Sequence, residues 1–448
     1  MEKYTLVIGL EIHVELKTKS KMFCQCSADY FGKQPNSQTC PVCLGMPGAL
    51  PVPNQQAIEW TIKMGKALGC HINVITKFDR KHYFYPDLAK GYQISQYDEP
   101  IAVNGKLALK IKGNKEKGDE EKTFRIHRIH LEEDTGKLMH VNSDTLIDFN
   151  RSSVPLVEIV TEADFDNAED VKCFLEELHT IIRYLGVSDA DMDKGTMRME
   201  PNISVKLKGH KGFPPYKVEV KNINSFNFVK RAIEYEFERQ VALIENGEIP
   251  KQETRGFDDQ KMITYSQRVK EEASDYRYFP EPDIPPLSFQ EEILNIIENS
   301  IPELPAQKVA RYIKDWKIKS DDAFIITREL EVAIYFEQVV FLASKDVKDL
   351  GEIPQKIANF MINKKITGDK LPSEFYEEVK TKLKPIESDP ILLKDLVASV
   401  ISANEKVVAE YKAGKLTVLM FLVGQVMKDA KGKLNANDVR VQFLKELS

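Results

Sequence analysis

Glu11 and His13 have the residue types and the spacing for metal chemistry. They stand two apart in Leu6–Leu16, where Leu, Ile and Val occupy every second position. A strand would place both on the face opposite its apolar side chains, about 7 Å apart. A carboxylate and an imidazole held on a rigid strand can bind one hard cation. The same pattern also fits a plainer interpretation, in which Glu11, His13 and Glu15 form a solvated face.

Glu158 is the next candidate, because it interrupts the apolar run Pro155–Val160. A carboxylate on a buried strand is costly unless it is paired or binds a metal. Together with Glu11, His13 and one acid of 132–134, it would make a site for a divalent cation that bridges phosphates. A salt bridge is the alternative, and three arginines are its possible partners: Arg125, Arg128 and Arg151.

Four cysteines stand at the spacing of metal ligands: Cys24, Cys26, Cys40 and Cys43. Four thiolates on tight turns favour a closed tetrahedral Zn²⁺ site. Because no position is left for water, such a site would be structural and not catalytic. The alternative is four reduced cysteines at the surface.

Polar residues on later strands are candidate contacts for phosphate or a nucleotide. Asn202 and Ser204 share one strand face, and segment 218–225 ends in hydrogen-bond donors at a helix N-terminus, which attracts anions. The full set of candidates is Arg151, Arg198, Asn202, Ser204, Asn222, Asn224 and Ser225. The sequence has no Gly-x-x-x-x-Gly-Lys-Ser/Thr loop and no dinucleotide-binding glycine fingerprint, so a different arrangement would hold a nucleotide.

The composition excludes several classes of protein. A chain of 448 residues is too long for one hydrophobic core. A net charge of -6 gives no global signal for nucleic acid, so any RNA contact must be local. The N-terminus lacks a basic region followed by an apolar one, and no apolar run approaches ~18 residues. We therefore expect a cytoplasmic protein with no membrane association.

The elements that must position these residues follow from the hydrophobic periods. Strands are expected at 6–16, 101–111, 124–131, 145–149, 155–160, 203–207 and 217–223. Helices are expected after Asn54, over 167–185 and over 225–246, each with a capping residue. Short strands mixed with a few helices, without strict βαβ alternation, predict an α+β domain around an antiparallel or mixed sheet.

The chain is expected to have three domains. The proline-dense segment 278–287 ends the α+β domain near residue 288. Helical patterns follow at 291–299, 308–316 and 329–344, and the prolines at 385 and 390 mark a second break. The expected division is a cradle domain at 1–288 with a zinc loop at 24–43, a helical domain at 289–386 and a helical tail at 387–448.

Long segments in fixed order resemble the B subunits of tRNA-dependent glutamyl/aspartyl amidotransferases, and the resemblance covers nearly the whole chain. The matching segments are GLEIHVELKT (9–18), KFDRKHYFYPD (77–87), QISQY (93–97), HLEEDTGK (130–137), DFNRS (148–152), PLVEIV (155–160), DYRYFPEPDI (275–284) and GKLTVLMFLVGQVMK (414–428). The family implies a cradle-like α+β domain, a helical domain and a small tail domain that contacts tRNA. It also implies a heterotrimer, in which the partners are an amidase (the A subunit) and a small third subunit (C).

The reaction that the resemblance implies has two steps. ATP phosphorylates the side-chain carboxylate of glutamate or aspartate misattached to tRNA(Gln) or tRNA(Asn). Ammonia, which the amidase releases from glutamine, then displaces the phosphate and gives Gln-tRNA(Gln) or Asn-tRNA(Asn).

Carried over position by position, the resemblance also implies roles for single residues. The cation of phosphoryl transfer, Mg²⁺ or Mn²⁺, would bind Glu11, His13, Glu133 and Glu158. Lys81 and Lys90 match positions along the passage for ammonia. The competing hypothesis is a non-catalytic, zinc-containing scaffold that binds tRNA for a partner amidase. The acids discriminate between the two, because a pure RNA binder gains nothing from carboxylates beside phosphates.

Overall fold

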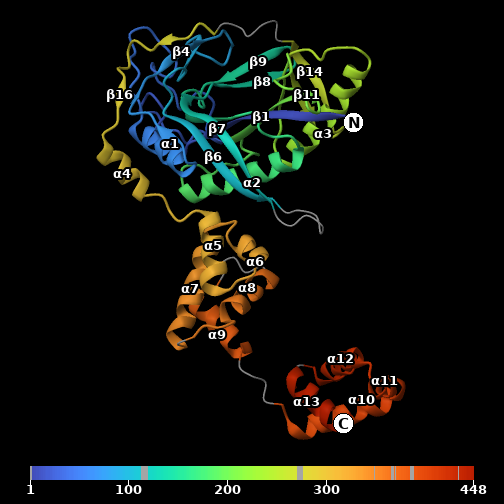
Figure 1. The fold of residues 1–448 in the computed structure, drawn as a ribbon. Helices are drawn as coiled ribbons and strands as arrows, with labels where there is room; N and C mark the ends of the chain where they lie inside the picture. Colours follow the sequence, from blue (N-terminus) through green and yellow to red (C-terminus); the bar gives the residue numbers. More distant parts are fainter. Residues whose placement is uncertain are drawn as a thin grey trace. The chain divides into compact units, whose positions relative to one another are not determined.

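The computed structural model describes residues 3–111, 120–269, 276–347, 349–364, 368, 370–383, 388–431 and 433–447 (Figure 1). The chain splits into two compact units, one of Met1–Ile313 with Ala323–Leu330 and one of Lys314–Asp322 with Glu331–Ser448. The α+β class expected from the sequence is confirmed. The division into three domains stays a prediction, and its second boundary falls within 384–387, outside the described residues. Among the described helices, none combines the length and apolar character needed to cross a membrane.

Strand β1 (Tyr4–Glu15) lies in the middle of a nine-stranded sheet. In spatial order the strands are β14 (Ile263–Val269), β13 (Glu253–Asp258), β12 (Val218–Lys221), β11 (Met197–Leu207), β1, β10 (Pro155–Thr161), β7 (Glu120–Glu133), β6 (Ala102–Ile111) and β2 (His71–Ile72). The β12–β13 pair is parallel and the other neighbouring pairs are antiparallel, so the sheet is mixed, as expected.

The apolar face of β1 explains its central position. Ile8, Ile12 and Val14 are fully buried, and each contributes about 1.5–3 kcal/mol by leaving water. Helices α1 (Gln55–Ala67), α2 (Ala168–Leu185) and α3 (Phe226–Glu245) contact strands β7, β6 and β11 of this sheet. Figure 1 shows α2 running along the strands. The opposite face of β1 is therefore free to carry polar side chains.

Polar side chains cap the three helices that pack on the large sheet, and Asn54 and Ser225 are caps that the sequence predicts. Asn54 accepts a hydrogen bond from the backbone of α1, Asn167 from that of α2 and Ser225 from that of α3. Gly186 ends α2 with a φ of 70°, in the left-handed region where a Cβ would be strained.

Smaller strands accompany the large sheet, and one of them corresponds to the strand expected at 145–149. The aromatic segment 77–93 contributes β4 (Asp79–His82) and the start of β5 (Tyr92–Ser95), which form a three-stranded sheet with β15 (Phe279–Pro280). Strands β8 (Lys137–Val141) and β9 (Asp144–Asp148) form a hairpin, and β3 (Ile75–Thr76) pairs with β16 (Leu287–Ser288). Helix α4 (Glu291–Asn299) contacts α1.

The rest of the described chain is helical, as predicted. Its helices are α5 (Pro305–Trp316), α6 (Ser320–Ile326), α7 (Leu330–Asp346), α8 (Ile353–Lys364), α9 (Pro372–Leu383), α10 (Pro390–Ala403), α11 (Glu405–Lys412), α12 (Leu419–Ala430) and α13 (Ala436–Leu447), with a short 3₁₀ turn η1 (Leu416–Val418). Side chains from α10, α12 and α13, with Val397, Leu422 and Phe443 among them, form a separate hydrophobic core.

Candidate active site

Ionisable side chains form a row across the polar face of the large sheet. The strand register places His13 on β1 opposite Glu158 on β10, and Glu158 opposite His130 on β7. His13 Nε2 lies 3.6 Å from Glu158 Oε2, and His130 Nε2 lies 3.1 Å from the same oxygen. Three strands from distant parts of the sequence therefore bring these side chains to one point.

Glu132, and not Glu133, joins this row. Side chains alternate along β7, so Glu132 shares the face of His130, whereas Glu133 points to the other face. Glu132 Oε1 lies 3.7 Å from His13 Nε2. His13, Glu132 and Glu158 each offer a donor atom, and these atoms lie within 4.8 Å of one another. We call these three residues the cation group. The structure thus brings Glu132 to this group, whereas the residue expected there was Glu133.

Glu133 forms a buried ion pair with Lys90 on the other face of the sheet. Lys90 Nζ lies 2.6 Å from Glu133 Oε2, and the backbone N–H of Ile94 donates to Oε1 at 2.9 Å. The Lys90 side chain is 8% exposed and that of Glu133 is 2% exposed. The ring centroids of Phe23 and Tyr92 lie 5.8 Å and 5.9 Å from Lys90 Nζ. Removing one partner would leave an uncompensated charge in this apolar setting, at a cost of about 3–5 kcal/mol.

The pKa values of His13 and Glu158 in the cation group are strongly shifted. Burial disfavours a charged His13, but the hydrogen bond to Glu158 and the negative charges around it outweigh burial and raise the pKa of His13 to about 9. Burial likewise opposes the charge of Glu158, yet the attraction of His130 and His13 holds the pKa of Glu158 well below its usual range. The Nδ1 atoms of both histidines are buried and have no hydrogen-bond partner among the described residues. We expect a divalent cation to displace the proton of His13.

The arginines considered as partners for Glu158 are engaged elsewhere or do not pair with it. Arg125 Nε donates to Asp164 Oδ2 at 2.9 Å, and Arg151 donates to two backbone carbonyls. Within the described part of the chain, no ion pair joins Arg128 to Glu158. The partners described for Glu158 are the two histidines named above.

Glu11 lies on the same face but belongs to a neighbouring acidic group. The register places Glu11 opposite Glu200, and together with Glu219 their oxygens lie within 4.8 Å of one another. Asn202 Nδ2 donates to Glu11 Oε1 at 3.0 Å. Burial and the surrounding carboxylates raise the pKa of Glu11. The expected set of four ligands is therefore not gathered at one point, because Glu11 and His13 fall in adjoining groups.

A cavity of about 520 Å³ opens beside Glu11. Its lining includes Asn202 and Ser204 from β11, and it extends to Phe213 and Lys217. Asn202 Oδ1 is buried and has no partner among the described residues, whereas Ser204 Oγ donates to a backbone carbonyl. The volume lies in the range of small-molecule and cofactor sites. Two of the seven predicted nucleotide contacts thus line a cavity beside Glu11.

Arg198 is partly exposed and pairs with buried carboxylates. Arg198 forms an ion pair with Asp134, and its Nη2 lies 3.7 Å from Glu15 Oε1. Tyr30 OH donates to Glu15 Oε2 at 3.0 Å, and Glu15 is 4% exposed. The solvated position expected for Glu15 is therefore wrong, and Arg198 is occupied by protein carboxylates.

The three residues expected at the helix N-terminus do not line the cavity beside Glu11. Ser225 Oγ accepts a hydrogen bond from Phe228 N at 3.1 Å, so its hydroxyl serves as the cap of α3. Asn222 has a φ of 64°, and Asn224 is exposed beside it. These three residues therefore lie where β12 ends and α3 begins.

The two lysines expected along one passage have different partners. Burial works against the charge of Lys81, but the attraction of nearby carboxylates, Glu132 first, outweighs it and raises the pKa of Lys81. Lys81 Nζ lies 5.1 Å from the ring centroid of Tyr276. Lys81 is thus coupled to the cation group, whereas Lys90 is paired with Glu133.

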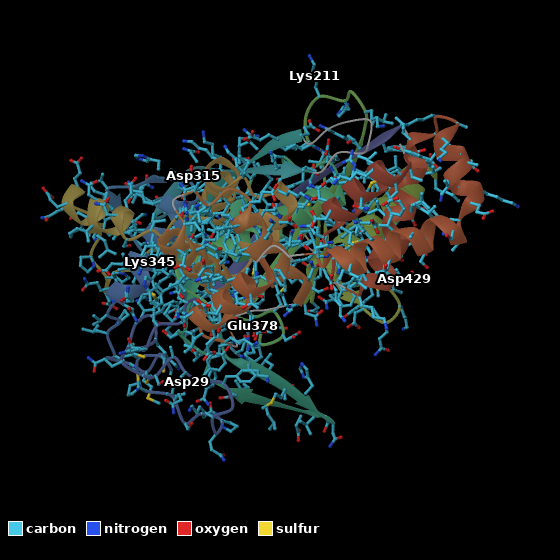
Figure 2. All side chains as sticks on the ribbon, turned by 90° about the horizontal axis from the view of Figure 1, so that it is seen from below. Asp29, Lys211, Asp315, Lys345, Glu378 and Asp429 are labelled. Atoms are coloured by element: carbon cyan, nitrogen blue, oxygen red, sulfur yellow. The ribbon has the colours of Figure 1, made fainter. Side chains whose placement is uncertain are left out.

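The four cysteines come together as their spacing predicts. Their Sγ atoms lie within 4.8 Å of one another, and Cys40 N donates to Cys43 Sγ at 3.1 Å. A hydrogen bond from Cys24 lowers the pKa of Cys43 to about 5, although burial opposes this. Figure 2 labels Asp29 in the same loop and shows sulfur atoms near it. Four thiols this close, one of them acidic, fit a tetrahedral metal ion.

Sequence reasoning missed His130 as a member of the site and did not single out Glu132. A signal was present, because Ile129 and Leu131 alternate with them and would place both on the polar face of a strand. It also missed Lys21, which lies beside the cysteines. A lysine in the polar stretch 17–21 resembles a solvated one, so the sequence offered no signal for it.

Comparison with known proteins agrees with the resemblance seen in the sequence. Residues 6–295 match the family model described as the GatB/GatE catalytic domain, and residues 345–447 match the one described as the GatB domain. The chain is 43% identical to the B subunit of the aspartyl/glutamyl-tRNA(Asn/Gln) amidotransferase of Persephonella marina, over 98% of each chain. It is 44% identical to the protein of that name from Thermotoga maritima, over 97% of each chain. From its two matched domains and these full-length relatives, we conclude that the chain belongs to the GatB family of amidotransferase B subunits.

Proposed function

We propose that the chain works as the B subunit of a tRNA-dependent amidotransferase, a ligase that forms carbon–nitrogen bonds with glutamine as the amide donor. Relatives with this name are similar to the chain over nearly their whole length. The products are Gln-tRNA(Gln) and Asn-tRNA(Asn), made from Glu-tRNA(Gln) and Asp-tRNA(Asn). Assembly into a heterotrimer with an amidase and a small third subunit is part of the proposal.

The observation that carries the catalytic part is the convergence of His13, Glu132 and Glu158 beside the cavity at Glu11. Two carboxylates and an imidazole make a mixed oxygen and nitrogen donor set that suits Mg²⁺ or Mn²⁺. Carboxylates repel the phosphates of RNA, so a chain that served only as a tRNA scaffold would lose affinity by gathering them. The acids therefore favour phosphoryl transfer over the scaffold hypothesis.

In this proposal, the cavity holds the nucleoside of ATP and the cation group faces its phosphates. The cation, when bound, offsets the negative charge that develops during phosphoryl transfer. Asn202 and Ser204 line the cavity, and the unpartnered Asn202 Oδ1 can accept a hydrogen bond from a ribose hydroxyl. Glu11 orients Asn202 through the hydrogen bond between their side chains.

The carboxylate of the tRNA-bound amino acid attacks the γ-phosphorus, the bond to ADP breaks, and an acyl phosphate forms. Ammonia then attacks the acyl carbon, and inorganic phosphate leaves with the electrons of the broken bond. Phosphorylation is needed because an ionised carboxylate is a poor electrophile. Lys81, which keeps its positive charge beside Glu132, is placed to attract the anionic substrate. The protein contributes mostly positioning and electrostatics.

Lys90 and Glu133 are the proposed border of the ammonia passage. Their buried ion pair lies among Phe23 and Tyr92, in surroundings that exclude water. The carboxylate of Glu133 and the ammonium group of Lys90 can hydrogen-bond to ammonia on its way to the acyl phosphate. Lys81 is the second lysine of the proposed passage, at the side of the cation group.

The remaining features are proposed to stabilise the fold or to contact tRNA. Zn²⁺ on Cys24, Cys26, Cys40 and Cys43 is proposed to be structural. Phe84, Tyr85 and Tyr97 are exposed aromatic residues on which unpaired bases of tRNA can stack. The tail at 387–448 is proposed to contact the body of the tRNA.

The experiment is reconstitution with the amidase and the small subunit, followed by assay of each misacylated tRNA with ATP and glutamine. The proposal predicts conversion of Glu-tRNA(Gln), Asp-tRNA(Asn) or both, dependent on ATP and on Mg²⁺ or Mn²⁺. Conversion that needs no ATP, or none with either tRNA by an assembled complex, would contradict it.

A further inference from the structure

Lys21 is a buried cation beside the cysteine cluster. Its side chain is 0% exposed. Its Nζ donates to Gln38 O at 2.7 Å and to Phe149 O at 3.4 Å, and it lies 3.7 Å from Cys43 Sγ. In the described residues, no carboxylate pairs with this ammonium group.

A buried ammonium is costly unless a negative charge compensates it. The two carbonyl oxygens satisfy hydrogen-bond donors of Lys21 but carry no formal charge. Of the three groups that Lys21 Nζ contacts, Cys43 alone can become an anion. Four neutral thiols would therefore leave Lys21 uncompensated, whereas metal-bound thiolates would not.

Lys21 also ties the cysteine loop to its surroundings. Gln38 belongs to the loop, and Phe149 follows the last residue of β9. Ser152 Oγ adds a hydrogen bond to Cys43 O at 3.1 Å. The loop and the segment after β9 thus meet at the position of the ammonium group.

We propose that Lys21 is the charge partner of a zinc tetrathiolate centre at these four cysteines, and that its positive charge determines how tightly the centre keeps its metal. Four thiolates and one Zn²⁺ carry a net charge of about −2, and one ammonium group within hydrogen-bond reach halves it. Groups just outside the ligand shell commonly change metal affinity by about 10–100-fold. The inference rests on the zinc assignment above and is independent of the ATP chemistry.

Three variants of the full chain test the role of this charge. Lys21→Met keeps the length of the side chain without its charge, and Lys21→Gln keeps a hydrogen-bond donor without the charge. Lys19→Met is the matched control, because Lys19 is exposed two residues away. Zinc content is measured by metal analysis, and zinc release by transfer to a chromogenic chelator. Wild type and Lys19→Met should hold one equivalent and release it slowly, and both Lys21 variants should release it at least about tenfold faster.

Thermal unfolding distinguishes the loss of the Lys21 charge from a loss of side-chain packing. With zinc, Lys21→Met should lower the melting temperature. After zinc removal under reducing conditions, the loss should be smaller, because fewer thiolates then remain to interact with the ammonium group. The same loss with and without zinc would overturn the proposal, and so would wild-type zinc release by Lys21→Gln.

Co²⁺ substitution of the wild type tests the zinc assignment itself. Thiolate-to-cobalt charge-transfer bands of a tetrahedral site are expected. A wild type that takes up neither Zn²⁺ nor Co²⁺ would overturn the zinc assignment and this inference together. Normal zinc binding with unaltered release from the Lys21 variants would overturn the inference alone.

Discussion

His13 on β1 lies directly opposite Glu158 on β10, with Nε2 3.6 Å from Oε2. The two residues are far apart in the sequence, and each stands on a strand whose other face is packed in the core. Ile12 and Val157 next to them are fully buried, which fixes the phase of both strands. A slip of one residue in either strand would bury the polar pair and expose the apolar one.

Glu132→Gln and Glu133→Gln should separate the two halves of the reaction. Glu132 belongs to the cation group, so Glu132→Gln should lower tRNA-dependent ATP cleavage by about a hundredfold or more. Glu133 pairs with Lys90, so Glu133→Gln should leave ATP cleavage near wild type and reduce amidation from glutamine. Both are measured in the assembled complex with Glu-tRNA(Gln).

The reverse pattern, with Glu133→Gln abolishing ATP cleavage and Glu132→Gln sparing it, would contradict the face assigned to each residue. Glu169→Gln serves as a control, because Glu169 lies in a partly exposed pair with Lys230 and does not line the cavity.

Binding of Mn²⁺ should become tighter as the pH rises from 7 to 9. The pKa of His13 is raised to about 9, so at pH 7 its ring carries a proton that the metal must displace. The association constant should therefore rise by about tenfold per pH unit and level off above pH 9. Titration calorimetry in buffers of different ionisation enthalpy measures both the affinity and the proton released. A flat profile in the wild type would exclude His13 as a ligand.

Gly45→Ala should disturb Lys90. A Cβ at Gly45 would clash with Lys90 Cγ and lie 3.0 Å from Lys90 Cα, and Gly45 has a φ of +66°. Gly48→Ala is the matched control, because its φ is +82° and nothing lies within 4 Å of its Cβ. Both changes should cost about 1–2 kcal/mol of stability from backbone strain.

Only Gly45→Ala should also lower amidation with glutamine while sparing tRNA-dependent ATP cleavage. Equal effects of the two alanines on amidation would show that the contact with Lys90 is irrelevant to ammonia transfer.

Ser153→Gly should stabilise the protein. Ser153 has a φ of 68°, in the region where an L-residue is strained by about 1–2 kcal/mol, and its buried Oγ has no partner among the described residues. The greater freedom of glycine in the unfolded chain offsets part of this gain, so we expect a net increase of about 0.5–1 kcal/mol. Chemical denaturation measures the difference. Ser152→Gly is the comparison and should destabilise, since Ser152 Oγ bonds the cysteine loop.

The sequence predicted the polar face of β1 because a period of two is a strong signal over eleven residues. It also predicted Glu158 as a site residue, since a carboxylate in an apolar run needs a partner. The residue pattern did not decide between Glu132 and Glu133, and the family resemblance pointed to Glu133. Adjacent acids at the end of a strand look alike until the pairing with β10 fixes which one shares the face of His13.

Other elements were not predicted for the same physical reason. Strands β13 and β14 were not expected, because polar residues such as Arg255 and Gln267 interrupt their apolar pattern. Arg255 is satisfied by Glu236 and Glu253, which lie on a helix and on its own strand. Buried polar networks of this kind depend on tertiary contacts, so local periodicity does not reveal them.

The central claim is that His13, Glu132 and Glu158 form the site of phosphoryl transfer. Its most direct test is tRNA-dependent formation of ADP from ATP in a single turnover, in the assembled heterotrimer, with Glu-tRNA(Gln) and no amide donor. The account predicts that Glu158→Gln and His13→Ala lower this ADP formation by at least about a hundredfold, while each variant still copurifies with its partners. Wild-type ADP formation in either variant would contradict it.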